Sequence, residues 1–153
     1  MRPLVDGDAF RRLSAARDHA RAHFAEPLRV EHLAKIAGMS RFHFVRTFHR
    51  SFGETPHAFL TGVRIRRAKE LLARSGAHVT DVCFDVGFSS LGSFSALFAR
   101  HVGRPPSAFQ REMVALAQCP GGLARAFVPH CFASRFGALV VPAEGSRPLP
   151  RRA

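Results

Sequence analysis

The segment SRFHFVRTFHRSFGETPHAF, residues 40–59, has a second version fifty residues later, SLGSFSALFARHVGRPPSAF, at residues 90–109. Glycine, proline and apolar residues keep their places in both versions. The matching pairs are Ser40 and Ser90, Phe44 and Phe94, Phe48 and Phe98, Arg50 and Arg100, Gly53 and Gly103, Pro56 and Pro106, Ala58 and Ala108, and Phe59 and Phe109. Because glycine and proline recur at the same offset, the same backbone turns recur, and the sequence predicts a structural repeat.

Helical periodicity surrounds the first version of the segment. Gly38 can adopt the left-handed conformation that follows a helix end, and the next helix begins three residues later. Two helices separated by a short glycine-containing turn are typical of a helix-turn-helix unit. The expected helices are residues 8 to about 24, with Asp8 as the cap, about 30–37, and 41 to about 52, with Ser40 as the cap.

The pattern restarts after a long joining helix. Pro56 fits the first turn of this helix, which is expected to reach about Arg74. Thr80 is the expected cap of the next helix, Gly87 its end, and Ser89 or Ser90 the cap of the helix that follows; Pro106 opens the last one. Since alternating strand patterns are nearly absent, we predict an all-α fold of about seven helices, with two helix-turn-helix units joined by a long helix.

The expected domain organisation follows from these landmarks. An N-terminal extension, residues 1–7, precedes a double helix-turn-helix domain, residues 8–116. Within it we expect a first unit at about 8–55, a linker helix at about 56–74 and a second unit at about 79–116. Residues 117–153, rich in glycine and proline, are expected to form a tail that is partly disordered.

The charge of the chain indicates its class of partner. Its net charge is +12, almost all from arginine, since Lys35 and Lys69 are the only lysines. Such a balance favours nucleic acid first and an anionic membrane surface second. No apolar run approaches the roughly 18 residues of a spanning helix, no signal peptide is visible, and three unpatterned cysteines argue against a disulfide framework. We therefore expect a cytoplasmic protein with no membrane partner.

With these residues in place, the chain resembles the DNA-binding domain of AraC-type bacterial transcription regulators over about residues 8–115. The second copy carries the pattern in Asp85-Val86-Gly87-Phe88-Ser89-Ser90, Phe94, Phe98, Gly103, Pro106 and Phe109. The first copy adds Leu33, Ala34, Gly38, Ser40, His43, Phe44, Arg46, Phe48 and Gly53. The resemblance implies a transcription regulator whose two recognition helices, about 41–52 and 90–102, enter successive major grooves of double-stranded DNA.

The same resemblance suggests how the protein is organised on DNA. A joining helix of 19 residues, 56–74, would be roughly 28 Å long, comparable with the ~34 Å between major grooves one turn apart. One chain could therefore span two half-sites, and a monomer on DNA is expected, with RNA polymerase as a further partner. Only about seven residues precede the first expected helix, so we expect a stand-alone domain without a sensor domain.

In the first recognition helix, residues 42, 45, 46 and 49 form one row outside the Phe44, Phe48 and Phe52 stripe. Arg46 is the leading base reader, because a guanidinium can bond O6 and N7 of guanine together. Phe42 and Val45 are expected to touch thymine methyl groups, and His43 to pack or bond the backbone. The expected phosphate contacts are Ser40, Arg41, His49 and Arg50; for the last two a solvated surface position is an equal alternative.

The second recognition helix has Leu91, Gly92 and Ala96 where many family members carry glutamine and arginine. None of these side chains can form a bidentate hydrogen bond. Leu91 is expected to make apolar base contacts, while Gly92 marks either a close approach to DNA or simple tolerance. The expected phosphate contacts are Ser89, Ser90, Ser93, Ser95 and Arg100. We therefore predict that the first half-site carries most sequence information and the second mainly affinity.

Other functions fit the sequence less well. Cys119, His130 and Cys131 could join His19 and His23 around a metal, but their spacings match no zinc framework, and no set of catalytic residues is visible. We predict no enzyme activity, no metal and no cofactor. The chain lacks the Pro-Cys-His-Arg motif of DNA-repair-associated modules, so that function is less favoured. The main alternative is a non-specific architectural DNA-binding protein. On the joining helix, Arg64, Arg66, Arg67 and Lys69 are expected to be solvated or to pair with Glu70, Asp81 or Asp85.

Overall fold

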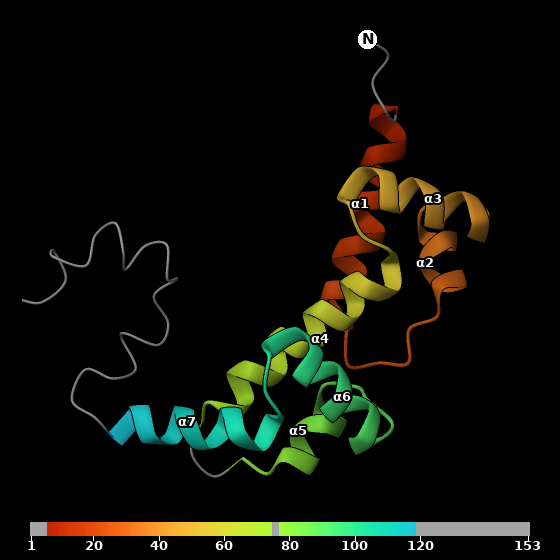
Figure 1. The fold of residues 1–153 in the computed structure, drawn as a ribbon. Helices are drawn as coiled ribbons and strands as arrows, with labels where there is room; N and C mark the ends of the chain where they lie inside the picture. The colour runs from red at the N-terminus through yellow and green to blue at the C-terminus, as the bar shows by residue number, and fades with distance from the viewer. Residues whose placement is uncertain (1–5, 75–76, 119–153) are drawn as a thin grey trace, which may run out of the picture. The chain divides into compact units, whose positions relative to one another are not determined.

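The computed structural model describes residues 6–74 and 77–118, and the regular structure within these ranges is entirely helical (Figure 1). The helices are α1 (Gly7–Ala22), α2 (Val30–Ile36), α3 (Arg41–Phe52), α4 (Pro56–Leu72), α5 (Val79–Asp85), α6 (Leu91–Val102) and α7 (Pro106–Gln118). The all-α prediction is confirmed. We call α1–α3 the first unit and α5–α7 the second unit; α4 packs against helices of both. The predicted tail lies outside the described residues, apart from residues 117 and 118, which belong to the end of α7.

Capping residues define the helices that contain the repeated segment. The hydroxyl of Ser40 accepts from the amide of His43 at 3.4 Å, and the hydroxyl of Thr55 accepts from the amide of Ala58 at 3.2 Å at the start of α4. Pro56 occupies the first position of that helix, where no amide hydrogen is needed. These local signals are why the predicted starts of α3 and α4 are confirmed.

Two predicted caps are wrong, because both residues lie inside their helices. Asp8 lies in the first turn of α1, where its carboxylate pairs with Arg11 at 3.4 Å and Arg12 at 3.2 Å and complements the helix dipole. Thr80 lies in the first turn of α5, after the cap His78. The actual caps of these two helices make no side-chain capping bond, so the starts lack the signature on which the prediction rested.

Three predicted helix ends are also one or two residues too late. α1 ends at Ala22, short of Phe24; α2 ends at Ile36; α4 ends at Leu72, short of Arg74. At the end of α1, the backbone amide and the ring Nδ1 of His23 both lie 3.0 Å from the carbonyl oxygen of His19. Helix α4 is 17 residues long, so its length is roughly 26 Å, slightly less than predicted.

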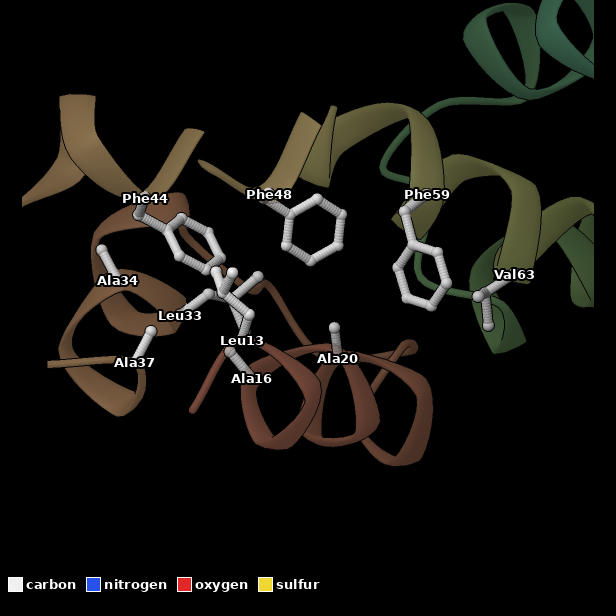
Figure 2. Close-up of a cluster of buried hydrophobic side chains, with 10 residues drawn as sticks. All are labelled: Leu13, Ala16, Ala20, Leu33, Ala34, Ala37, Phe44, Phe48, Phe59 and Val63. Carbon is white, nitrogen blue, oxygen red and sulfur yellow. The ribbon is translucent and has the colours of Figure 1, made fainter. Parts of the chain in front are cut away.

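The first core lies where α1, α2, α3 and the beginning of α4 meet (Figure 2). Small residues on α1 and α2 leave room for rings from α3 and α4. The buried residues are Leu13, Ala16 and Ala20 from α1, Leu33, Ala34 and Ala37 from α2 and its end, Phe44 and Phe48 from α3, and Phe59 and Val63 from α4. The first core thus includes α4, and Phe44 and Phe48 of the predicted stripe on α3 lie inside it.

The second core repeats this aromatic arrangement. Phe94 and Phe98 on α6 are fully buried with ring centroids 5.6 Å apart, as Phe44 and Phe48 are on α3 at 5.5 Å. Phe109, on α7, lies edge-on to Phe98 at 5.6 Å. Aromatic rings at these separations gain from both area burial and edge-to-face geometry. The repeated phenylalanines of the sequence are therefore the centres of two similar cores.

The turns of the two units differ in length by one residue. α2 and α5 begin at residues 30 and 79, 49 apart, whereas α3 and α6 begin at residues 41 and 91, 50 apart. The turns start alike, because the amide of Met39 bonds the carbonyl of Ala34 at 2.9 Å and the amide of Phe88 bonds that of Cys83 at 3.1 Å. Ser89 is the additional residue of the second turn.

Candidate nucleic-acid interface

The outward face of α3 is set by the residues that the helix buries. Phe44 and Phe48 point toward α1 and are at most 1% exposed (Figure 2), which fixes the rotation of the helix about its axis. Phe42 and Arg46 are therefore exposed, and Phe42 has 80% of its surface open to solvent. Phe42 thus presents an apolar ring among the basic side chains of this helix face.

Around Phe42 the surface is hollowed. An open depression of about 460 Å³ is lined by Arg41, Phe42, Val45 and Arg46. Of the predicted row, Phe42, Arg46 and His49 are exposed, whereas Val45 is partly buried and also packs against the first core. The structure thus brings the apolar side chains of Phe42 and Val45 together with the guanidinium groups of Arg41 and Arg46 on one helix face. Such a face combines apolar contact with hydrogen-bond donors for a planar polar group.

Two residues of α3 differ from their predicted surroundings. Arg41 forms an ion pair with Glu31 of α2 at 3.2 Å, but both side chains are more than half exposed. Such a pair contributes about 0–1 kcal/mol, so Arg41 is easily released to another anion. Of the two predicted roles of His43, packing is wrong: its side chain is exposed, because it lies next to Phe44 on the helix but outside the buried stripe. Its carbonyl oxygen accepts from the Thr47 hydroxyl at 2.8 Å.

The corresponding face of α6 carries small side chains. The Ser90 hydroxyl accepts from the amide of Ser93 at 3.3 Å and donates to the Ser93 hydroxyl at 2.9 Å, so Ser90 is the cap of this helix. Leu91 is 41% exposed, and Gly92 and Ala96 are also exposed. Among the predicted phosphate contacts, Ser89, Ser90, Ser93 and Arg100 are exposed and Ser95 is partly buried. The polar groups of this face are serine hydroxyls and the guanidinium of Arg100, and residues 91, 92 and 96 supply no bidentate donor.

The basic residues of α4 do not form one solvated face. Arg67 pairs with Glu70 at 2.7 Å, as predicted, Arg66 is exposed, and the Lys69 ammonium lies 5.9 Å from the ring centroid of Phe109. The prediction for Arg64 is wrong, because this side chain is partly buried and donates to the backbone of the loop between α1 and α2. Burial lowers its pKa from the ordinary value of an arginine, yet the group stays a cation at neutral pH.

Three histidines gather at the junction of α1 and α2. The His19 ring stacks on that of His23 with centroids 4.2 Å apart and lies 5.3 Å from that of His32. Partial burial, and secondarily the charges of His23 and His32, lower the pKa of His19. Within residues 6–74 and 77–118, no group of three or more histidine, cysteine, aspartate or glutamate side chains is arranged to hold a metal ion. Cys119, His130 and Cys131, considered as metal ligands above, lie outside the described residues.

The third cysteine is unsuited to chemistry at the surface. Cys83 is fully buried in the second core, and burial raises the pKa of its thiol. In the part of the chain that is described, no helix is long and apolar enough to cross a membrane.

The chain is similar to known helix-turn-helix proteins. A helix-turn-helix domain family matches residues 33–112, more than half of the 153 residues. The MmsAB operon regulatory protein of Pseudomonas aeruginosa is 32% identical over 113 residues, which is 74% of this chain and 36% of that protein. A helix-turn-helix-type transcriptional regulator of Haemophilus influenzae is 34% identical over 84 residues, 55% of this chain and 28% of that protein. The chain thus spans well under half the length of these relatives.

Solved structures match about two thirds of the chain. The DNA-binding domain of the global transcriptional factor AdpA, crystallised with a target DNA, superposes with a TM-score of 0.65 and 33% identity, covering 68% of this chain and 94% of that chain. A transcriptional regulator with an AraC-type DNA-binding domain from Chromobacterium violaceum superposes with a TM-score of 0.63 and 25% identity, covering 71% and 96%. Both structures are matched over nearly their whole length.

Proposed function

Because the chain belongs to the AraC family of helix-turn-helix transcription regulators, we propose that it is a sequence-specific regulator that places α3 and α6 in successive major grooves. The observation that carries this proposal is the outward face of α3, where Phe42 and Arg46 stand exposed around an apolar depression. The matched AdpA domain was crystallised with its target DNA, and the net charge of +12 suits a phosphate backbone.

We propose that α3 reads bases. Arg46 supplies a bidentate pair to guanine, and Phe42, with the partly buried Val45 beneath it, supplies apolar contact to thymine methyl groups. His49 and Arg50, both exposed toward the end of α3, would hold phosphates. Ser40 would contact phosphate at the start of the helix, and Arg41 would exchange Glu31 for a phosphate on binding.

The second recognition helix is proposed to anchor. The exposed hydroxyls at the start of α6, together with backbone amides of its first turn, would donate to a phosphate. Leu91 adds apolar base contact, and Arg100 adds charge near the other end of the helix. The proposed phosphate contacts are Ser89, Ser90, Ser93, Ser95 and Arg100. Sequence information would thus come mainly from the first half-site.

One chain supplies two recognition helices, so we propose that a single copy binds each site. The roughly 26 Å length of α4 is comparable with, though shorter than, the ~34 Å between successive major grooves. RNA polymerase stays the proposed further partner through which binding would regulate transcription.

Binding measurements with point variants test the division of roles. Arg46→Ala should relax specificity at one base pair of the first half-site, losing about 1–3 kcal/mol of discrimination there. Arg100→Ala should weaken binding to all sequences alike and flatten the salt dependence by about one unit in log–log slope. Titrations of a selected duplex and its single-base variants, at several salt concentrations, measure both effects. Equal base-substitution penalties in the two half-sites would contradict the proposal.

The small side chains of α6 favour one second candidate, a non-specific architectural DNA-binding protein. Gly92 and Ala96 leave little to distinguish one base pair from another. A competition titration separates the candidates at physiological salt, because a specific regulator keeps a preference of at least ~10³ for its site over unrelated duplex. A preference near one would favour the architectural candidate.

A further inference from the structure

The loop between α1 and α2 is held by a side chain of the joining helix. The Nε of Arg64 donates to the carbonyl oxygen of Phe24 at 2.7 Å, and its Nη2 donates to that of Glu26 at 2.9 Å. A planar guanidinium makes two such bonds at a fixed mutual angle, whereas a lysine ammonium is a point donor. Arg64 therefore fixes both the place and the direction of this loop, residues 24–26, relative to α4.

The residue between these two carbonyls lies against the second unit. A Cβ built on Gly87 would be 2.5 Å from the carbonyl oxygen of Ala25 and 2.9 Å from its Cα. Any side chain at residue 87 would have to displace backbone, so glycine permits this approach. The 24–26 loop of the first unit is thus hydrogen-bonded by Arg64 of α4 and lies in contact with the turn between α5 and α6.

The contact is connected to the second core. The guanidinium carbon of Arg64 lies 5.7 Å from the ring centroid of Phe88, the residue after Gly87. The Phe88 ring lies 5.3 Å from that of Phe94, which is fully buried. A cation over an aromatic face is attracted to it, more strongly where water is excluded. Arg64 therefore contacts, with one group, the backbone of the first unit and an aromatic ring of the second.

This arrangement is not part of the repeated scaffold. Gly38, at the corresponding place in the first turn, would bring an added Cβ to 3.1 Å from the end of the flexible Arg12 side chain, not to backbone. Fifty residues after Arg64 stands Val114, which has no donor. Among the described residues this contact lies between the two units and has no counterpart at the repeated positions, and so it can define how one unit is oriented to the other.

We propose that Arg64 is a positioning residue that, with Gly87, holds the two helix-turn-helix units at one relative orientation and thereby fixes the number of base pairs between the half-sites. This inference rests on the proposed function. Adding one base pair between half-sites rotates the second by about a tenth of a turn and moves it by ~3.4 Å. A rigid joint rejects that change, while a loosened joint tolerates it.

The orientation itself is measurable without DNA. Residual dipolar couplings of backbone amides in the full chain give one alignment tensor for the helices of the first unit and one for those of the second. We expect the two tensors to coincide in the parent protein and in Arg66→Met, a control at an exposed arginine of the same helix. They should differ in Arg64→Met, which keeps an unbranched apolar stem as far as the position of Nε but removes both donors. Coinciding tensors in Arg64→Met would overturn the proposal.

Arg64→Lys covers the case in which Arg64→Met does not fold. It retains the charge and an aliphatic stem but cannot bond both carbonyl oxygens in the geometry of a guanidinium. We expect a smaller divergence of the two tensors, with the amide spectra of both units still dispersed. Tensors that coincide in Arg64→Lys while Arg64→Met is unfolded would assign Arg64 to folding alone and overturn the positioning role.

The consequence for DNA is tested with a series of duplexes that differ in the spacing of the half-sites. The parent protein should lose at least about tenfold in affinity when one base pair is added or removed. Arg64→Met should lose most of this discrimination while its affinity for an isolated first half-site stays within about twofold. Equal discrimination in the variant, or an equal loss on every duplex including the isolated half-site, would contradict the role.

The two measurements separate this inference from the proposed function. If the parent protein shows no site preference on any duplex but its tensors coincide and diverge in Arg64→Met, the proposed function fails and Arg64 still orients the units. If site preference is present and spacing discrimination survives Arg64→Met, the function stands and the positioning role fails.

Discussion

The turns of the two helix-turn-helix units begin with the same backbone conformation but contact different neighbours. Gly38 and Gly87 both have positive φ, 62° and 86°, and each follows a helix of seven residues. Gly38 faces the movable end of the Arg12 side chain, whereas Gly87 faces the backbone of Ala25. Glycine at the first position is required by conformation alone, and at the second by conformation and by space.

The outward faces of α3 and α6 also differ, but here it is the first unit that carries the larger side chains. At the repeated positions fifty residues apart, Phe42 of the first unit corresponds to Gly92 of the second, and Arg46 corresponds to Ala96. The buried faces stay alike, with Phe44 and Phe48 matched by Phe94 and Phe98. The repeat has thus been kept where the cores demand it and has diverged where only solvent or a partner is in contact.

The largest expected effect comes from alanine at the two glycines of the turns. Both substitutions place a side chain at positive φ, at a cost of about 1–3 kcal/mol each. This backbone strain therefore contributes little to the difference in stability between the two variants. Gly87→Ala also forces Cβ against the backbone of Ala25, and overpacking of this kind costs about 1–3 kcal/mol more. Urea unfolding of the two variants measures the difference. Equal losses of unfolding free energy would show that the close approach of Gly87 to Ala25 relaxes freely.

Giving the second recognition helix the arginine of the first is expected to have the next largest effect. Ala96→Arg restores a bidentate donor at an exposed position, so discrimination at one base pair of the second half-site should rise by about 1–3 kcal/mol. Ala96→Lys, which adds charge without the guanidinium fork, is the matched control. Selection from random duplexes should reveal a new preferred guanine for the arginine variant only. A general rise in affinity shared by both variants would mean that residue 96 meets phosphate instead.

Glycine within two helices gives a smaller effect and decides an open alternative. An added Cβ meets nothing within 4 Å at Gly92 on α6 or at Gly62 on α4. Alanine at either site should therefore raise the unfolding free energy by about 0.5–1 kcal/mol. DNA affinity is then compared between the two variants. A loss confined to Gly92→Ala would place the α6 backbone close to the duplex, whereas unchanged binding would make Gly92 a tolerated residue.

The smallest expected effect is a pH dependence confined to the first unit. The pKa of His19 is lowered in the folded protein, so the unfolded chain binds more protons, and stability is lost as pH falls through the ordinary histidine range near 6.5. The free energy of unfolding should thus decline between about pH 7.5 and 5.5, and less so in His19→Gln. His101→Gln, at an exposed position on α6, is the control. Parallel declines in the parent and His19→Gln would exclude this cause.

Local chemistry explains which parts of the fold could be predicted from the sequence. Ser40, Gly53 and Pro56 each act on the backbone within a few residues, so the ends of α3 and the start of α4 follow from them alone. The starts of α1 and α5 lack a side-chain cap bond, and the prediction chose the nearest residue of capping type. The seven helices and their two similar cores were thus predictable, apart from a few terminal residues.

The candidate site was predictable only in part, because exposure depends on helix rotation and partners on tertiary contacts. The buried stripe of Phe44 and Phe48 correctly implies that Phe42 and Arg46 face outward. The partners of Arg64 lie 38 and 40 residues away in the chain, and no local pattern distinguishes this arginine from the exposed Arg66. A glycine-containing turn likewise cannot reveal that Gly87 lies against Ala25.

The position of α4 in the first core has a consequence for the order of folding. Phe59 and Val63 lie in the same buried cluster as Leu13 and Phe44, so the first unit lacks part of its core until this helix has been synthesised. The bonds of Arg64 to the 24–26 loop close a loop of about forty residues, which carries an entropic cost that helix formation does not. Nascent chains that stop before residue 64 should therefore expose apolar rings. During synthesis, the first unit should complete its core only after α4 has left the ribosome.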